Sequence, residues 1–193
     1  NGRGYGATGA FLHGAVAMFL NVSFMDCASS YGAIRLEGGS KLIWHYGSIK
    51  ESKSSGWNGG ALSSVYGPNS LTMENLLILN NSVHWQPGKI SLDGTTIGGV
   101  FHFVSGGLFE FRNCKFCGNS APAGANGTDL SIHPDFTGTV KIIDTKFNSS
   151  VFDPNGRIQT CNASNACTVG NHTGTCANAD VGVSCYGCGL DNN

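Results

Sequence analysis

The stretch FEFRNCKFCGN, residues 109–119, contains the pattern that decides the fold of this chain. Apolar residues at alternate positions precede a polar residue, and another apolar residue follows three positions later, as in Phe109-x-Phe111-x-Asn113-x-x-Phe116. Alternation with a period of two is typical of a strand that buries one face. The same pattern recurs at residues 17–24, 42–49, 71–78 and 140–147.

A short apolar step precedes each of these segments. Counted from the second residue of the step, successive copies are 23, 28, 39 and 29 residues apart, so we expect the insertions to lie in turns. Two short strands cannot bury an apolar face alone, and each unit must therefore stack on the next. The sequence predicts an all-β solenoid, a parallel β-helix of about five coils, with a sandwich or barrel as the alternative. The copies are Gly9-Ala10-Phe11, Gly32-Ala33-Ile34, Gly60-Ala61-Leu62, Gly99-Val100-Phe101 and the degenerate Thr128-Asp129-Leu130.

Two segments resemble the repeats of polymorphic outer-membrane proteins, in which a GGA-like step alternates with an F-x-x-N step. Gly59-Gly60-Ala61-Leu62 resembles the first step, and Phe116-Cys117-Gly118-Asn119 resembles the second. Looser copies place Cys27, Asn81 and Ser150 three residues after an apolar residue. The resemblance covers about residues 9 to 150 and implies a right-handed, pectin-lyase-like β-helix, which is a statement about fold and not about activity.

Composition indicates a secreted protein. Eight cysteines and six N-x-S/T sequons in 193 residues favour an oxidising, glycosylating pathway and an extracellular or cell-surface location. The only cofactor-like groups expected are N-linked glycans. At Asn21 a glycan competes with an inward or stacking role, because this residue occupies the aligned polar position of the repeat. The candidate glycosylation sites are Asn80, Asn126, Asn148, Asn162, Asn171 and Asn21.

Neither nucleic acid nor a membrane is an expected partner. The net charge is −1, only 12% of residues are charged, and no basic stripe is present. The apolar residues 10–24 are too few to span a bilayer and are interrupted by His13, Gly14 and Asn21. The chain begins with Asn1 and has the character of a mature or excised fragment.

The pattern changes near Pro154, which divides the chain into a predicted β-helix, residues 1–154, and a disulfide-rich cap or tail, residues 155–193. The candidate disulfide cysteines are Cys27, Cys114 and Cys117 in the first part and Cys161, Cys167, Cys176, Cys185 and Cys188 in the second.

Because the first part has three cysteines and the second has five, complete pairing within the chain requires a bridge between the two parts. Cys114 and Cys117 are close enough in sequence to bridge each other, which leaves Cys27 for the tail. Strand spacing separates Cys27 from the last coil by roughly 20 Å, so either the tail folds back or the bond joins two molecules.

The open ends of a β-helix carry unpaired backbone groups that invite another chain. We therefore expect an extracellular structural protein whose subunits self-associate head to tail into a fibre or surface filament, or else a capped segment of a larger surface protein. An adhesin or carbohydrate-binding segment is a further alternative, in which Trp57 and Trp85 contact surface glycans and Trp44 packs in the core.

A polysaccharide-degrading enzyme is a weaker alternative, and no catalytic residue is assigned. The polygalacturonase pattern needs paired aspartates, which are missing, although His13-Gly14 and Arg157-Ile158 are present. Solvated strand faces explain the separate carboxylates more simply. No metal site is expected, since calcium needs clustered acidic loops and secreted cysteines favour disulfides. The carboxylates weighed for catalysis are Asp26, Glu74, Glu110 and Asp144.

Overall fold

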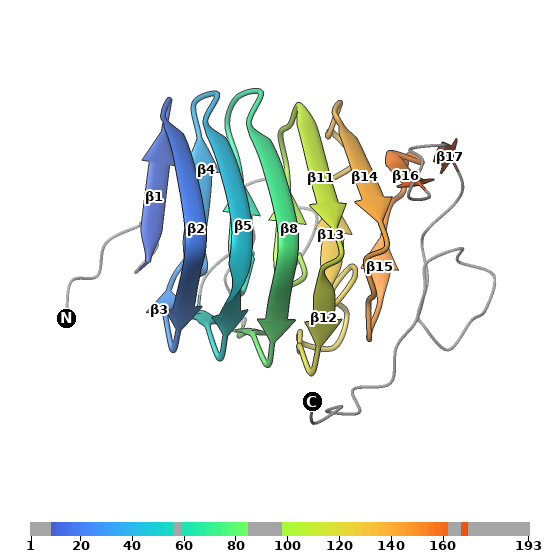
Figure 1. Cartoon of the computed structure of the whole chain (residues 1–193). Helices are drawn as coiled ribbons and strands as arrows, with labels where there is room; N and C mark the ends of the chain where they lie inside the picture. Colours follow the sequence, from blue (N-terminus) through green and yellow to red (C-terminus); the bar gives the residue numbers. More distant parts are fainter. Residues whose placement is uncertain (1–8, 56–58, 85–97, 162–166, 170–193) are drawn as a thin grey trace.

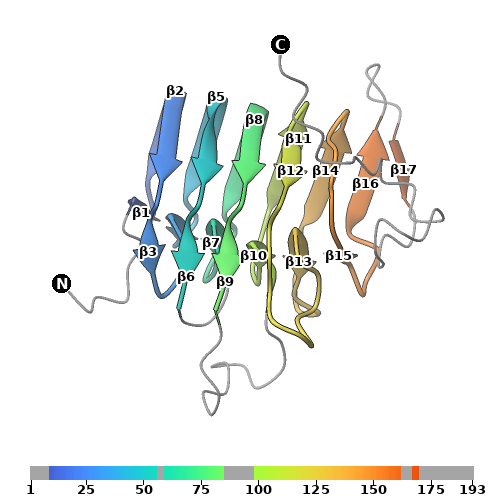
Figure 2. The same cartoon turned by 90° about the horizontal axis from the view of Figure 1, so that it is seen from below.

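The computed structural model describes residues 9–55, 59–84, 98–161 and 167–169, and within these ranges the chain forms strands and turns without a helix. The strands form three sheets, and the chain visits them in turn, so that neighbours within a sheet belong to successive repeats (Figures 1 and 2). Every strand pair is parallel except β16 with β17, and none of the sheets closes into a barrel. The prediction of an all-β protein with parallel sheets is confirmed. No helix in the described ranges could cross a membrane.

The first sheet contains the short apolar steps. Its six strands lie in the order β1 (Ala10–His13), β4 (Ile34–Glu37), β7 (Leu62–Ser64), β10 (Phe101–Phe103), β13 (Leu130–Ile132) and β15 (Val151–Phe152). A third, smaller sheet contains β3 (Ala28–Ser29), β6 (Lys53–Ser54) and β9 (Ser82–Val83).

The largest sheet contains the longer repeat segments. It begins with β2 (Val16–Met25), β5 (Lys41–Lys50) and β8 (Ser70–Leu79), each ten residues long. Next come β11 (Leu108–Arg112), β14 (Thr139–Ile143), β16 (Ile158–Cys161) and β17 (Cys167–Val169), while β12 (Lys115–Cys117) also pairs with β8. The parallel ladder thus continues through β16, beyond the expected boundary at residue 154, because Ile158 lies opposite Val140.

The register follows the aligned apolar positions of the longer segments. Phe19 lies opposite Trp44, Trp44 opposite Met73, and Met73 opposite Phe111. The first short step is an exception, because Ala10 and not Phe11 lies opposite Ile34. A shift of one residue reverses every side chain, so Phe11 is 53% exposed, and the expected alignment of this copy was wrong.

Aromatic rings fill the space between the sheets. Phe103 stacks on Phe109 with centroids 4.3 Å apart, and Phe116 stacks on Phe147 at 4.6 Å. Trp44 is fully buried, as expected for a packing residue. Rings from successive repeats therefore contribute to one hydrophobic core.

The aligned polar residue of each longer segment bends the strand. The residues at this position have φ between 47° and 58°, the left-handed region that Asn and Asp tolerate best. Their side chains lie at the surface, where the Nδ2 group of Asn113 donates to Oδ1 of Asn75 at 2.6 Å. The residues are Asn21, Tyr46, Asn75, Asn113 and Asp144.

The Asn of the F-x-x-N step, and Asn81 at the equivalent position, cap the corner of the preceding repeat. Asn119 Oδ1 accepts from the backbone N–H of Asn81 at 3.0 Å, and Asn81 Oδ1 accepts from that of Ser52 at 3.0 Å. The Nδ2 groups of Asn119 and Asn81 donate to the carbonyls of Ile78 and Ile49 in the coil before. Both amides are buried, so this ladder satisfies backbone groups that water cannot reach.

We expect Asn81→Asp to lower the free energy of unfolding by about 2 to 3 kcal/mol, because a buried carboxylate would face the Ile49 carbonyl without a donor. Asn75→Asp makes the same change at the strand bend, where the side chain still accepts from Asn113. Its expected effect is within about 0.5 kcal/mol. Urea unfolding measures both, and equal losses would contradict the structural role of the ladder.

Candidate functional site

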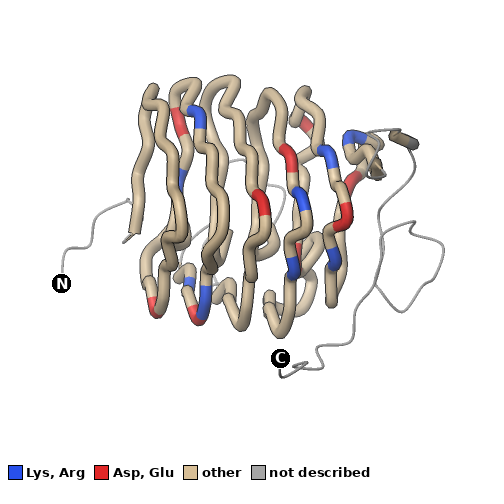
Figure 3. The backbone as a smooth tube through the Cα atoms, in the orientation of Figure 1, with Lys and Arg blue, Asp and Glu red and all other residues tan. Residues whose placement is uncertain are grey.

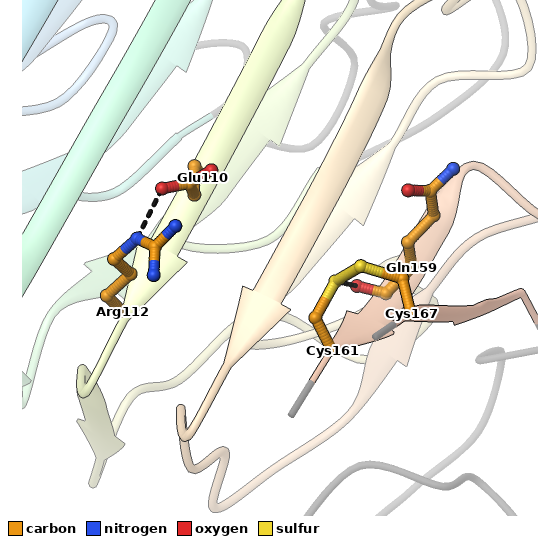
Figure 4. The surroundings of a disulfide bond; sticks show 5 residues. All are labelled: Glu110, Arg112, Gln159, Cys161 and Cys167. Atoms are coloured by element: carbon orange, nitrogen blue, oxygen red, sulfur yellow. Dashed lines mark hydrogen bonds and ion pairs between the residues drawn. A yellow bond between two sulfur atoms is a disulfide. The ribbon is translucent and has the colours of Figure 1, made fainter. Parts of the chain in front are cut away.

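The two ends of the largest sheet differ. At one end β17 lies antiparallel on β16, and the disulfide between Cys161 and Cys167 joins these strands (Figure 4). At the other end lies β2, and no described strand pairs with its outer edge. Roughly half of the backbone N–H and C=O groups of an edge strand point away from the sheet. β2 is therefore the longest uncovered edge among the described residues.

The outward face of β2 is uncharged and mainly apolar. None of its ten residues is charged, and Val16, Met18, Leu20 and Met25 are 79%, 69%, 68% and 63% exposed. We call these four residues the β2 surface. The equivalent positions two strands further along are Ser70, Thr72, Glu74 and Leu79. The acidic and basic residues of this sheet lie mainly on the later strands (Figure 3).

The aromatic core continues to this end without a complete cover. Phe19 and Phe24 meet Trp44 edge-on, with centroids 5.6 and 5.5 Å away, yet both are only partly buried. Trp44, one strand further in, has no exposed surface. Inward-facing residues of β2 would therefore gain burial from any strand added beside it.

The first sheet has a small charged cluster beside the same end. Arg35 and Glu37 form a buried ion pair on β4, and the Arg35 guanidinium lies 3.7 Å from the centroid of the Tyr31 ring. His13 on β1 lies 3.5 Å from Glu37. These contacts explain how an arginine is accommodated in a short, buried strand.

The carboxylates weighed for catalysis have separate structural roles. Asp26 and Asp144 occupy exposed bends with φ of 50° and 48°. Oε2 of Glu74 lies 2.9 Å from Nδ1 of His45 on the neighbouring strand. Glu110 forms an ion pair with Arg112 on its own strand (Figure 4). The described residues contain no group of three side chains suited to a metal ion.

The cysteines do not follow the expected pairing. Cys117 is disulfide-bonded, while Cys27 and Cys114 are free, so the bridge between Cys114 and Cys117 that their sequence separation allows is not formed. The Cys114 side chain points into the core, where burial raises its pKa to about 12, whereas Cys117 is only partly buried. Cys161 bonds to Cys167. Cys176, Cys185 and Cys188 lie outside the described residues.

The sequons occupy two kinds of position. Asn21 and Asn80 are exposed at left-handed bends with φ of 53°. Asn126 and Asn148 are partly buried, and the Asn148 backbone N–H donates to Asp129. Two sites, Asn162 and Asn171, lie outside the described residues, as do Trp57 and Trp85. Glycosylation stays a prediction at every site.

No protein-family model matches the chain, and neither a curated protein nor a solved structure matches it. The resemblance to polymorphic outer-membrane protein repeats therefore stays a prediction.

A buried carboxyl group replaces an apolar residue in the degenerate repeat step. Asp129 has no exposed surface, and its Oδ1 accepts from Nδ2 of Asn119 at 2.9 Å. Its Oδ2 accepts from the backbone N–H groups of Asn148 and Ser149 at 3.0 and 2.7 Å. Burial raises the pKa of the Asp129 carboxyl above the usual 3.8, although these hydrogen bonds act in the opposite direction. Asp129 thus connects the Asn ladder to the bend at residues 148–149.

We expect Asp129 to make stability fall as the pH rises. With its pKa raised in the folded state, its contribution is fully present below the usual pKa of 3.8 and is lost as the pH passes the folded-state value. Asp129→Asn removes this titration but loses acceptors for two backbone N–H groups. Urea unfolding of both proteins between about pH 3 and pH 7 should show a difference in stability that shrinks as the pH rises. A difference that grows with pH would contradict a raised pKa.

Proposed function

We propose that this chain is an extracellular, N-glycosylated structural protein, a right-handed parallel β-helix of about five coils whose copies self-associate through the first coil. The observation that carries the proposal is β2, a ten-residue edge without charge next to an incompletely covered aromatic core. Soluble proteins usually protect such edges with charged residues, prolines or a covering segment. An unprotected edge of this length favours assembly as its role.

Head-to-tail stacking is the arrangement that the sequence favours for such a subunit. It would place the first coil of one copy on the last coil of the next. The last strands of the largest sheet are short, with four residues in β16 and three in β17, against ten in β2. In such a filament, the ten-residue β2 of one copy would pair with a shorter strand of the next copy over only part of its length.

The adhesin alternative depends on Trp57 and Trp85, which lie outside the described residues. Trp44 is a core residue and offers no face to a sugar. The enzyme alternative gains nothing from Glu74 and Glu110, because each is paired with a basic side chain on a strand face. The geometry thus favours the structural role.

The first experiment measures self-association by sedimentation velocity and negative-stain microscopy. We expect wild-type protein to form assemblies, and Met18→Lys to weaken them at least tenfold in concentration, because the added ammonium would lie at the contact and lose hydration. Thr72→Lys is the matched control: it lies in the same row, two strands further along, with neighbours on both sides. It should assemble as wild type does. A wild-type monomer at all concentrations would refute assembly through the first coil.

The second experiment tests glycosylation after secretion from a eukaryotic host. We expect deglycosylation to lower the mass of the protein, and Asn80→Asp to remove one glycan, because Asn80 is exposed and Ser82 completes its sequon. Asn75→Asp makes the same change at another left-handed bend that lacks a sequon, and should leave the glycan number unchanged. An unmodified wild-type chain would contradict the glycoprotein assignment.

A further inference from the structure

We propose that the segment that covers β2 is β2 of a second copy, paired antiparallel across a two-fold axis. The inference rests on the proposed function and specifies the partner and its orientation. Two copies would then meet head to head through their first coils, and their covered ends would point away from each other.

The far end of the largest sheet has no uncovered described strand equal in length to β2. Its outer strand, β17, runs antiparallel to β16, and Cys161 and Cys167 bond across this pair (Figure 4). A copy that approached this end would meet a three-residue strand in place of a full repeat segment. The ten-residue edge of β2 finds a partner of equal length in another β2.

The residue pairs in an antiparallel contact between two β2 strands favour a second β2 as the partner. When two β2 strands overlap over all ten residues, Ala17 lies opposite Phe24 of the other copy, and Phe19 lies opposite Val22. All four of these residues pack against the core. Opposite residues in an antiparallel pair point to the same face, so inward residues meet inward residues. The partly buried rings of Phe19 and Phe24 would gain apolar neighbours.

The bend at Asn21 makes this register selective. Inward residues are Ala17 and Phe19 before the bend and Val22 and Phe24 after it, so the alternation changes phase at Asn21. A slip of one residue would set inward residues opposite outward ones in both halves. With full overlap, the axis passes between Leu20 and Asn21, and the bends of the two strands coincide.

The lack of charged residues on β2 also favours a symmetric contact. A symmetric contact places each side chain near its own copy, so any charge on β2 would meet the same charge nearby. Val16–Met25 contains none, and its outward pairs would be Val16 with Met25, Met18 with Ser23 and Leu20 with Asn21. Uncharged pairs of this kind are compatible with a self-complementary edge when Asn21 carries no glycan.

Cysteine cross-linking between two separately labelled proteins tests the geometry, in a Cys27→Ser background that removes the partly exposed free thiol. Met18→Cys protein is mixed with Ser23→Cys protein under mild oxidation. We expect a cross-linked heterodimer on non-reducing gels, with the 18–23 linkage identified by mass spectrometry. Each variant alone should give at least fivefold less cross-linked product. A mixture of Thr72→Cys with Ser23→Cys is the control and should give none above background.

Sedimentation of the wild type separates the outcomes. A dimer with the 18–23 linkage supports the two-fold contact. Assemblies that Met18→Lys abolishes, but that exceed a dimer or lack the linkage, overturn the two-fold contact and leave the proposed function standing. A monomer in every case, including one whose first coil is covered by another part of a longer chain, overturns both.

Discussion

The structure depends on parallel pairing between equivalent strands of successive repeats. In this arrangement each apolar position lies on the same position of the next coil, so Phe19, Trp44, Met73 and Phe111 form one inward row. A row of this kind cannot be built from one repeat, because a single coil leaves both edges of its strands unpaired. The bends and the corner ladder recur at equivalent positions of successive repeats and are compatible with this register.

The corners show how polar residues serve that register. Each coil must turn without leaving buried backbone groups unpaired, and the ladder from Asn119 through Asn81 to Ser52 meets this requirement with side chains of neighbouring coils. In the earlier repeat Ser52 occupies this position, and its hydroxyl donates to the Lys50 carbonyl of its own repeat at 3.4 Å. Asp129 accepts from Asn119 and ends the ladder at the point where the short step loses its glycine and its apolar residue. The degenerate copy is thus a structural adaptation.

The sequence predicted much of this arrangement, since the alternation around Phe109 and Phe111 determines both the strand and its inward face. The sequence-based prediction failed where a local pattern is compatible with two registers or two cysteine pairings. Residues 10–12 are all apolar, so either Ala10 or Phe11 could face inward, and only stacking on Ile34 decides. Sequence separation likewise suggested a bond between Cys114 and Cys117, but the bend at Asn113 turns the Cys114 side chain into the core.

Burial of the short strands was also not predictable from alternation. Arg35, Ser63, His102 and Ser131 occupy equivalent outward positions, yet each is at most 8% exposed. A period of two indicates which residues share a face, and not whether another segment covers that face.

The first repeat obeys the same packing constraint and leaves the outer edge of β2 uncovered by any described strand. Its inward residues must be apolar to stack on Trp44, and its outward residues are free to be charged, as Glu74 and Arg112 are in later strands. Val16, Met18 and Leu20 are apolar although packing within the described chain does not require it. Exposed apolar residues without an internal reason are best explained by an external contact. Because the inward positions of β2 lie symmetrically about its bend, a second β2 that runs antiparallel matches this pattern.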